Sequence, residues 1–206
     1  MMQDSEIVRL EAARRGRAGG VLAQAFRDDP AYIVAMPRAD KRADVLAWLF
    51  DRVVYYSLLY GEVYITSSLE GVVCWLPPGQ THVTLWRVVR SGLHATPLRM
   101  GLAAYRRFDA YMGYADAFHA RYAPESHWYL WAIGVAPASQ GKGIGSRLMQ
   151  PILKRADADG KACYLETGTE GNARFYEKHG FKVVGGGKVP KLGIQVLAMV
   201  REPANA

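Results

Sequence analysis

The chain has few cysteines and no long apolar run, and each shortage excludes a class of protein. Only Cys74 and Cys163 occur among 206 residues, far apart and each within an apolar, strand-like segment. Two such residues provide neither a disulfide framework nor a metal-ligand pair, so we expect a reducing, cytoplasmic location. The longest apolar stretches, 45–50 and 53–60, are separated by a charged pair. Neither approaches the roughly 20 residues that span a bilayer, which excludes a membrane span and a membrane partner.

Residues 1–20 lack the apolar segment and small-residue cleavage site of a secretory signal, so we do not expect export. Acidic residues are also outnumbered, with 19 Asp and Glu against 26 Lys and Arg, which gives a formal net charge of +7. Such a charge suits nucleic acid, but it suits a polyanionic small ligand equally well. Half of the residues are hydrophobic and no internal repeat or linker is present, so we predict one globular domain over residues 1–206.

Hydrophobic periodicity predicts an alternation of strands and helices. In the first half we expect a strand at 7–12, helices at 18–26 and 40–60, and a hairpin of strands 63–66 and 72–76. Gly61 is the expected left-handed residue that ends the second helix. A basic and aromatic stretch, 84–122, predicts a short helix and then a long one. In the second half we expect strands at 128–135, 162–167, 181–184 and 195–200, and helices at 145–159 and 172–179.

A glycine-rich turn at residues 135–146 joins the strand 128–135 to the helix that follows. Free backbone N–H groups and the positive end of the helix dipole meet there, and glycine allows a phosphate to approach the backbone, so the turn suits a pyrophosphate. A Walker A loop is excluded because Lys142 is followed by Gly143. A dinucleotide fingerprint is disfavoured because five residues, including Pro137, separate the strand from Gly141. A tight turn without a ligand is the alternative.

Two segments in this half of the chain carry a resemblance. Ile-Gly-Val-Ala-Pro (133–137) precedes Gln-Gly-Lys-Gly-Ile-Gly (140–145), and Tyr-Leu-Glu-Thr-Gly (164–168) precedes Asn-Ala-Arg-Phe-Tyr-Glu-Lys-His-Gly-Phe (172–181). Together they resemble the two signatures of the GCN5-related N-acetyltransferases (GNAT), and the likeness is closest to the puromycin N-acetyltransferase type. The resemblance covers about residues 128–181, whereas 78–122 matches nothing in the family.

The resemblance implies a fold and an activity. The fold is α/β (α+β), a mixed and mostly antiparallel central sheet of about 6–7 strands with helices on both faces and a parallel, splayed strand pair at the cofactor cleft. Residues 127–201 would form the acetyl-CoA-binding half and residues 1–126 the half with the acceptor-side helices. The activity is acetyl transfer from acetyl-CoA to a primary amine by direct attack on the thioester, without a metal.

The resemblance also assigns roles to individual residues. Tyr176 is the expected general acid for the leaving thiolate, with packing of its helix as the alternative. Glu166 is the expected base for the ammonium, with turn capping or a lysine pair as the alternative. Asn172 either contacts the cofactor or caps its helix. The remaining cofactor contacts are assigned to Ile133, Gly134, Val135, Gln140, Gly141, Lys142, Gly143, Ile144, Gly145 and Ser146.

The acceptor side is less defined by the sequence. In the Asp28-Asp29-Pro30 turn a carboxylate could hold a cationic amine, although the same triplet is an ordinary helix stop. Aromatic residues of the middle region could line an acceptor pocket or pack in the core; they are Trp86, Tyr105, Tyr111 and Tyr114. Four histidines share no metal-ligand spacing, which favours surface or core roles; they are His82, His94, His119 and His127.

Several functions therefore stay open. A small-molecule amine is the favoured acceptor, and a protein N-terminus or lysine is the alternative within the same family. A different class is a nucleic-acid-binding module, suggested by arginines interleaved with aromatic residues between 87 and 121, although no nucleic-acid motif accompanies them. A CoA-binding sensor without catalysis is a third function. Assembly as a homodimer is left open.

Overall fold

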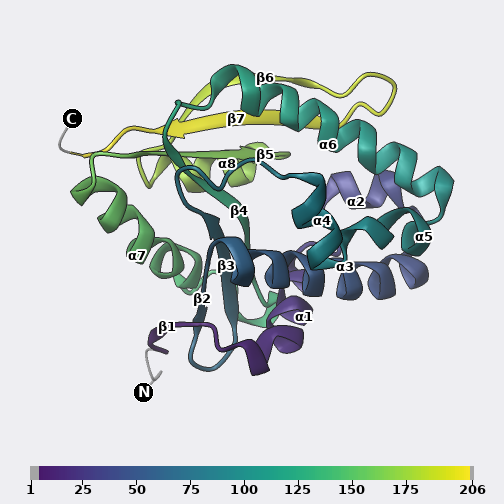
Figure 1. The fold of residues 1–206 in the computed structure, drawn as a ribbon, viewed down its shortest axis with the longest axis horizontal. Helices are drawn as coiled ribbons and strands as arrows, with labels where there is room; N and C mark the ends of the chain where they lie inside the picture. The colour runs from purple at the N-terminus through teal and green to yellow at the C-terminus, as the bar shows by residue number, and fades with distance from the viewer. Residues whose placement is uncertain (1–4, 205–206) are drawn as a thin grey trace.

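The computed structural model describes residues 5–204, and its seven strands form one mixed sheet (Figure 1). The strands are β1 (Ile7–Arg9), β2 (Glu62–Thr66), β3 (Gly71–Leu76), β4 (His127–Val135), β5 (Ala162–Thr167), β6 (Lys182–Lys188) and β7 (Gln195–Arg201). They lie in the order β1-β2-β3-β4-β5-β7-β6, and within this described sheet β4 and β5 are the one parallel pair of neighbours. The predicted mixed, mostly antiparallel sheet is confirmed.

Helices cover both faces of this sheet. The longer ones are α1 (Arg15–Ala25), α3 (Ala39–Tyr60), α6 (Leu102–Tyr122) and α7 (Ile144–Ala158), and the shorter ones are α2 (Pro30–Ala35), α4 (Leu85–Ser91), α5 (Thr96–Met100) and α8 (Glu170–Glu177). Short 3-10 turns lie at Ala12–Arg14, Leu93–Ala95 and Pro137–Ser139. The apolar faces of α1 and α3 pack on one side of β2, β3 and β4, and those of α7 and α8 pack on the other. No helix within residues 5–204 has the length and apolar character needed to cross a bilayer.

Two local predictions need correction. The turn at Asp28-Asp29-Pro30 does more than stop a helix, because Asp29 caps a further helix, α2, by accepting a hydrogen bond from the Ala31 N–H at 2.9 Å. Pro30 then occupies the first helical position, which suits its fixed φ. Gly61 ends α3 in an extended conformation, with φ −149°, and not in the left-handed one. A side chain there would collide with the Trp75 carbonyl, so the glycine allows close packing on β3.

The parallel strands β4 and β5 separate along their length. Their pairing covers His127 to Tyr129 on β4 and Ala162 to Tyr164 on β5, at the start of both strands. Beyond these residues β4 continues to Val135 and β5 to Thr167 without pairing to each other. The strands therefore diverge toward their carboxyl ends and open the sheet where the glycine-rich turn begins, as the resemblance implied.

Helix α6 is held against the far edge of the sheet by glycines. It runs beside β6 and β7 along the upper side of Figure 1. A Cβ atom at Gly185 or Gly187 would collide with the rings of Tyr122 or Tyr114 on α6. Because these glycines of β6 carry no side chain, the aromatic face of α6 can approach the strand closely. Another face of α6 turns toward the opening between β4 and β5.

Candidate active site

A cavity of about 1450 Å³ lies at the opening between β4 and β5. It is lined by Glu166 and by His119 of α6, and also by Phe175 and Tyr176 of α8. Tyr176 belongs to the core on the α7 side of the sheet, whereas α6 covers the other side. The cavity is therefore lined from both faces, which the separation of the two strands makes possible.

The glycine-rich turn forms one end of this cavity. Gly141 and Gly143 have φ of +77° and +73°, and a Cβ atom on either would meet no other group within 4 Å. These positive values favour glycine, and the space in front of the turn is open. Gly143 is the N-cap of α7, so the first N–H groups of the helix point toward this end of the cavity.

The cofactor residues assigned from the resemblance mostly meet at this cavity. Those that line it are Ile133, Gly134, Val135, Gln140, Gly141, Gly143, Ile144, Gly145, Ser146 and Asn172. Lys142 is exposed and its Nζ donates to the Ala138 carbonyl at 3.2 Å, so its side chain folds back on the preceding turn and does not line the cavity. Gln140 donates from Nε2 to the Val135 carbonyl at 3.1 Å, which fixes the turn to the end of β4.

Asn172 does not cap its helix. The N-cap of α8 is Thr169, whose hydroxyl accepts from the Asn172 N–H at 3.2 Å. Thr169 satisfies one of the free donors at the start of the helix, as an N-cap side chain does. The predicted capping role is therefore wrong, and the exposed Asn172 side chain faces the cavity.

Glu166 is a buried carboxylate in the wall of the cavity. Its side chain is 7% exposed, and its Oε2 accepts a hydrogen bond from the Tyr129 hydroxyl at 2.7 Å. The Tyr164 hydroxyl interacts with the same carboxyl group without normal hydrogen-bond geometry, and Oε1 has no hydrogen-bond partner within residues 5–204. Burial disfavours the charged form and raises the pKa of Glu166 to about 7, against the lowering effect of Tyr129. These contacts match neither of the two predicted alternatives for Glu166, which were capping of a turn and pairing with a lysine.

His127 and His119 form a chain of hydrogen bonds that ends next to Glu166, and the direction of each hydrogen bond is determined. His127 Nδ1 lies 2.6 Å from the Pro124 carbonyl, which can only accept, so Nδ1 carries the proton. His127 Nε2 is then the acceptor for His119 Nε2 at 3.0 Å. Neutral His119 therefore presents its unprotonated Nδ1 to Glu166 Oε1 at 3.8 Å. Burial lowers the pKa of both histidines, that of His119 to about 4, so the pair places no positive charge beside the carboxylate.

Tyr176 lies on α8 and is 8% exposed. Its ring packs against Phe181 at 5.9 Å and against Phe175 at 5.2 Å between centroids. Burial raises its pKa above the ordinary value, with a smaller contribution from the charge of Asp29, so the phenol stays protonated at neutral pH. Tyr176 therefore packs its helix and also lines the cavity, and its role as general acid stays a prediction.

The acceptor side of the cavity is formed by α2, α4, α5 and α6. Asp29, Tyr32, Tyr105 and Tyr111 all line it. Tyr114 contacts Gly187 of β6. Neither Tyr114 nor Trp86 belongs to the described residues that line the cavity. Trp86 is instead 68% exposed.

Sequence reasoning missed some residues of this site. Tyr129 and the histidine pair reach Glu166 from β4 and α6, and no local pattern links these segments to β5. One signal was available, since strand alternation places Tyr164 and Glu166 on the same face of β5. Cys163 lies on the opposite face, and burial raises its pKa to about 12, which suits a core residue and not a nucleophile.

Comparisons with known proteins agree with this geometry. Residues 68–181 match the model of the acetyltransferase (GNAT) family. An uncharacterized N-acetyltransferase of Schizosaccharomyces pombe is 29% identical over 181 residues, which cover 84% of this chain and 72% of that protein. N-alpha-acetyltransferase RimI of Mycobacterium tuberculosis is 38% identical over 76 residues, which cover 36% of this chain and 47% of that protein.

A solved structure shares the fold over the whole chain. It is a Corynebacterium glutamicum protein described as histone acetyltransferase HPA2 and related acetyltransferase, with a TM-score of 0.71 and 24% identity, and the match covers 98% of both chains. The likeness to the puromycin N-acetyltransferase type is not supported by these matches and stays a prediction.

Proposed function

The chain belongs to the GNAT family of acetyltransferases, and from this premise we propose that it transfers an acetyl group from acetyl-CoA to the primary amine of a small molecule. The observation that carries the proposal is Glu166, a buried carboxylate with a pKa of about 7 in a cavity that also contains the glycine-rich turn. A base with a pKa near neutrality suits removal of a proton from an ammonium group.

The residues at the opening between β4 and β5 fit acetyl-CoA. Gly141 and Gly143 leave open space in front of the N-terminus of α7, where backbone N–H groups would bind the pyrophosphate. The edge of β4 beyond Tyr129 does not pair with β5. Backbone groups of Ile133 to Val135 on that edge would hold the pantetheine chain and the thioester carbonyl. When bound, acetyl-CoA supplies the acetyl group as a thioester.

The proposed reaction divides the proton transfers between two side chains. Glu166 removes a proton from the ammonium, and the amine lone pair then forms the new C–N bond at the thioester carbonyl carbon. The C–S bond breaks, and Tyr176 donates its phenolic proton to the departing thiolate. The amide nitrogen then loses its remaining extra proton to solvent, and the Tyr176 phenolate takes up a proton from solvent, which leaves a neutral amide, CoA thiol and a restored phenol. Burial keeps Tyr176 protonated and brings Glu166 close to half ionisation at pH 7, so each group is available in the form that its role needs.

The walls of the cavity support a small acceptor. Helices α4, α5 and α6 all contribute to the lining, so three separate elements surround the space that an acceptor would occupy. A peptide α-amine is the second candidate acceptor, favoured by the similarity to the N-alpha-acetyltransferase RimI. That match covers 36% of this chain and does not itself describe an acceptor surface.

Release of CoA thiol tests the proposal and separates the two acceptors. The purified chain is incubated with acetyl-CoA and a panel of alkylamines, aminonucleosides, amino acids and short peptides. We expect release with at least one small amine and slower release with peptides. Release with peptides alone would favour the second acceptor, and no release with any amine would contradict the proposed activity.

We also propose that the reaction takes place in the cytoplasm. Cys74 and Cys163 are both buried and unpaired, which suits a compartment where thiols stay reduced.

A further inference from the structure

The cavity is acidic although the chain as a whole is basic. The ionisable residues of its lining, apart from histidines and tyrosines, are Asp29, Asp109, Asp116, Glu125, Glu166 and Lys178. Carboxylates thus outnumber cations five to one in the lining, whereas Lys and Arg outnumber Asp and Glu by 26 to 19 in the chain. A local excess of negative charge inside a basic protein attracts cations to this cavity and to few other places.

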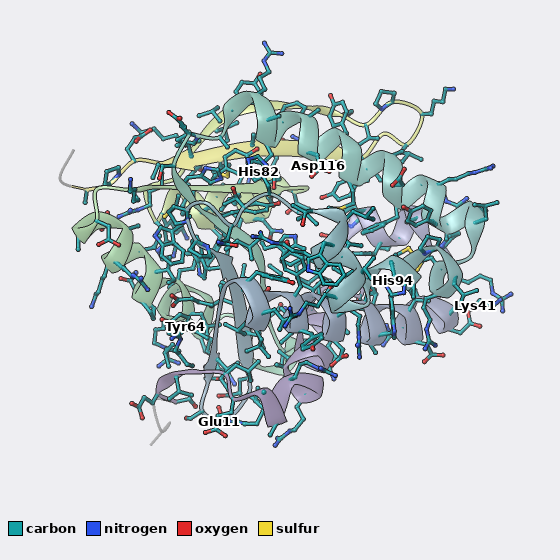
Figure 2. All side chains as sticks on the ribbon, in the orientation of Figure 1. Glu11, Lys41, Tyr64, His82, His94 and Asp116 are labelled. Atoms are coloured by element: carbon teal, nitrogen blue, oxygen red, sulfur yellow. The ribbon has the colours of Figure 1, made fainter. Side chains whose placement is uncertain are left out.

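Two of these carboxylates form a row along α6. Asp109 and Asp116 are seven residues apart, which puts them on the same face of the helix about 10 Å apart along its axis. Asp116 is exposed to the cavity and is labelled on α6 in Figure 2. Partial burial and the charge of Asp109 raise the pKa of Asp116. Its charge in turn contributes to the raised pKa of Glu166, so the row leads toward the proposed base.

Asp29 adds negative charge from the N-terminus of α2, a helix that packs against α6. Its charge contributes to the raised pKa of Tyr32, Tyr111 and Tyr176, which places it within electrostatic reach of both the acceptor side and the proposed acid. The ring of Tyr32 stacks on Phe108 at 5.8 Å. Aromatic faces next to carboxylates favour organic cations.

These charges have no cationic partner in the folded chain. Within residues 5–204, no Lys or Arg lies within salt-bridge distance of Asp29, Asp109 or Asp116. Independently, Glu166 Oε1 is buried without a hydrogen-bond partner in a side chain that lines the same cavity. A buried, unpaired carboxylate oxygen is unfavourable unless a ligand supplies a donor.

We propose that the acceptor is an aliphatic diamine that carries two positive charges. One ammonium group donates to Glu166 Oε1 and is the one acetylated. The second binds Asp116 on α6, and Asp109 adds negative charge farther along the same helix. This inference rests on the proposed function. Acetylation removes one of the two charges, because the ammonium becomes a neutral amide, so the product keeps only one of the two charge contacts.

The test compares matched amines. Values of kcat/KM are measured for α,ω-diamines of three to eight carbons and for n-alkylamines of equal length, with acetyl-CoA saturating. We expect a diamine of one or two adjacent lengths to exceed its matched alkylamine by at least about tenfold, which corresponds to about 1.4 kcal/mol, since the second ammonium adds a charge-assisted contact. The double variant Asp109→Asn, Asp116→Asn should remove this ratio by raising KM for the diamine. Because Asp116 also contributes to the raised pKa of Glu166, the quantity compared is the ratio of diamine to matched alkylamine within each variant.

The control is Asp28→Asn, which makes the same kind of substitution at one exposed residue outside the described lining. The Asp28→Asn variant should preserve the ratio of kcat/KM between the diamine and its matched alkylamine. Equal kcat/KM for diamines and alkylamines at every length, or a ratio that the double variant leaves intact, would overturn the inference while the proposed function stands. Absence of thiol release with both series would overturn the inference, and the proposed function falls with it only when the wider panel of aminonucleosides, amino acids and peptides also gives no release.

Discussion

Burial of the Glu166 carboxylate lowers the free energy of unfolding of the chain. Its pKa in the folded chain is about 7, against an ordinary value of 4.5. Between these two values the folded chain binds more protons than the unfolded chain, so the free energy of unfolding falls as pH rises through this window. Above about pH 7 the carboxylate is charged in both states, and the folded state bears the full free-energy cost of burying that charge.

Replacing this carboxylate should therefore stabilise the protein and inactivate it. We expect Glu166→Gln to melt at a higher temperature than the parent chain at pH 8, and the difference to vanish below about pH 4.5, where both side chains are neutral. We expect the same variant to lose about 10²-fold in kcat, because no base receives the ammonium proton. Thermal melts across pH and thiol-release rates check both effects. A lower melting temperature at pH 8 would contradict the buried charge.

Tyr129 sets the pH range in which Glu166 can act. Its hydroxyl donates to the carboxylate at 2.7 Å and lowers the carboxyl pKa. The Tyr129→Phe variant loses that donor, so the pKa should rise and the acid limb of kcat/KM should move to higher pH. The profile of thiol release between pH 5.5 and pH 9 measures the shift. An unmoved limb would mean that another group controls it.

Tyr176 carries the second proposed proton transfer. We expect Tyr176→Phe to lower kcat by at least about tenfold with little change in the affinity for acetyl-CoA, because the ring and its packing against Phe181 remain. Phe175→Leu serves as a packing control, since it alters a neighbouring ring without removing a hydroxyl. Turnover of Tyr176→Phe at the parent rate with the preferred amine would leave the tyrosine as a packing residue only.

At the scale of elements, the position of α6 depends on the glycines of β6. A Cβ atom at Gly185 would overlap the Tyr122 ring, so the helix and the strand would have to move apart. The carboxylates and His119 that line the cavity from α6 would move with it. The strand therefore contributes to the acceptor side although it does not line the cavity within the described chain.

We expect Gly185→Ala to destabilise the fold by about 1–3 kcal/mol through overpacking and to raise KM for the amine more than KM for acetyl-CoA. Gly113→Ala is the matched control, because a Cβ atom at this site within α6 meets nothing within 4 Å. That change should stabilise the helix by roughly 0.5–1 kcal/mol. Urea unfolding and steady-state kinetics on both variants give the comparison, and equal stability of the two variants would contradict the close packing.

The elements show how far local sequence patterns reach. Strand 162–167 is observed with the predicted bounds, and the glycine-rich turn lies between β4 and α7 as expected. Both follow from periodicity and from glycine at defined positions. The short helix α2 was missed because its signal is the same Asp-Pro pair that stops a helix. The extended conformation of Gly61 was missed because it depends on contact with Trp75, which is close in space and distant in sequence.

At the scale of the whole molecule, the opening in the sheet brings two chemistries into one cavity. The glycine-rich turn lies at one end, and carboxylates of α6 line the proposed acceptor side. The sequence predicted that the residues of the glycine-rich turn lie together because they are contiguous in the chain. It did not predict the acidic lining or the histidine pair, because these residues come from segments separated by up to about two thirds of the chain and carry no shared motif.

Calorimetric titration of acetyl-CoA into the purified chain tests the central claim most directly, since every step proposed above requires that this molecule binds at the opening between β4 and β5. We predict saturable binding of one equivalent in the parent chain. Gly143→Val should bind much more weakly, because valine is strained at a φ of +73° and fills the space before the helix N-terminus. No heat of binding in the parent chain, or equal affinity in both proteins, would contradict the account.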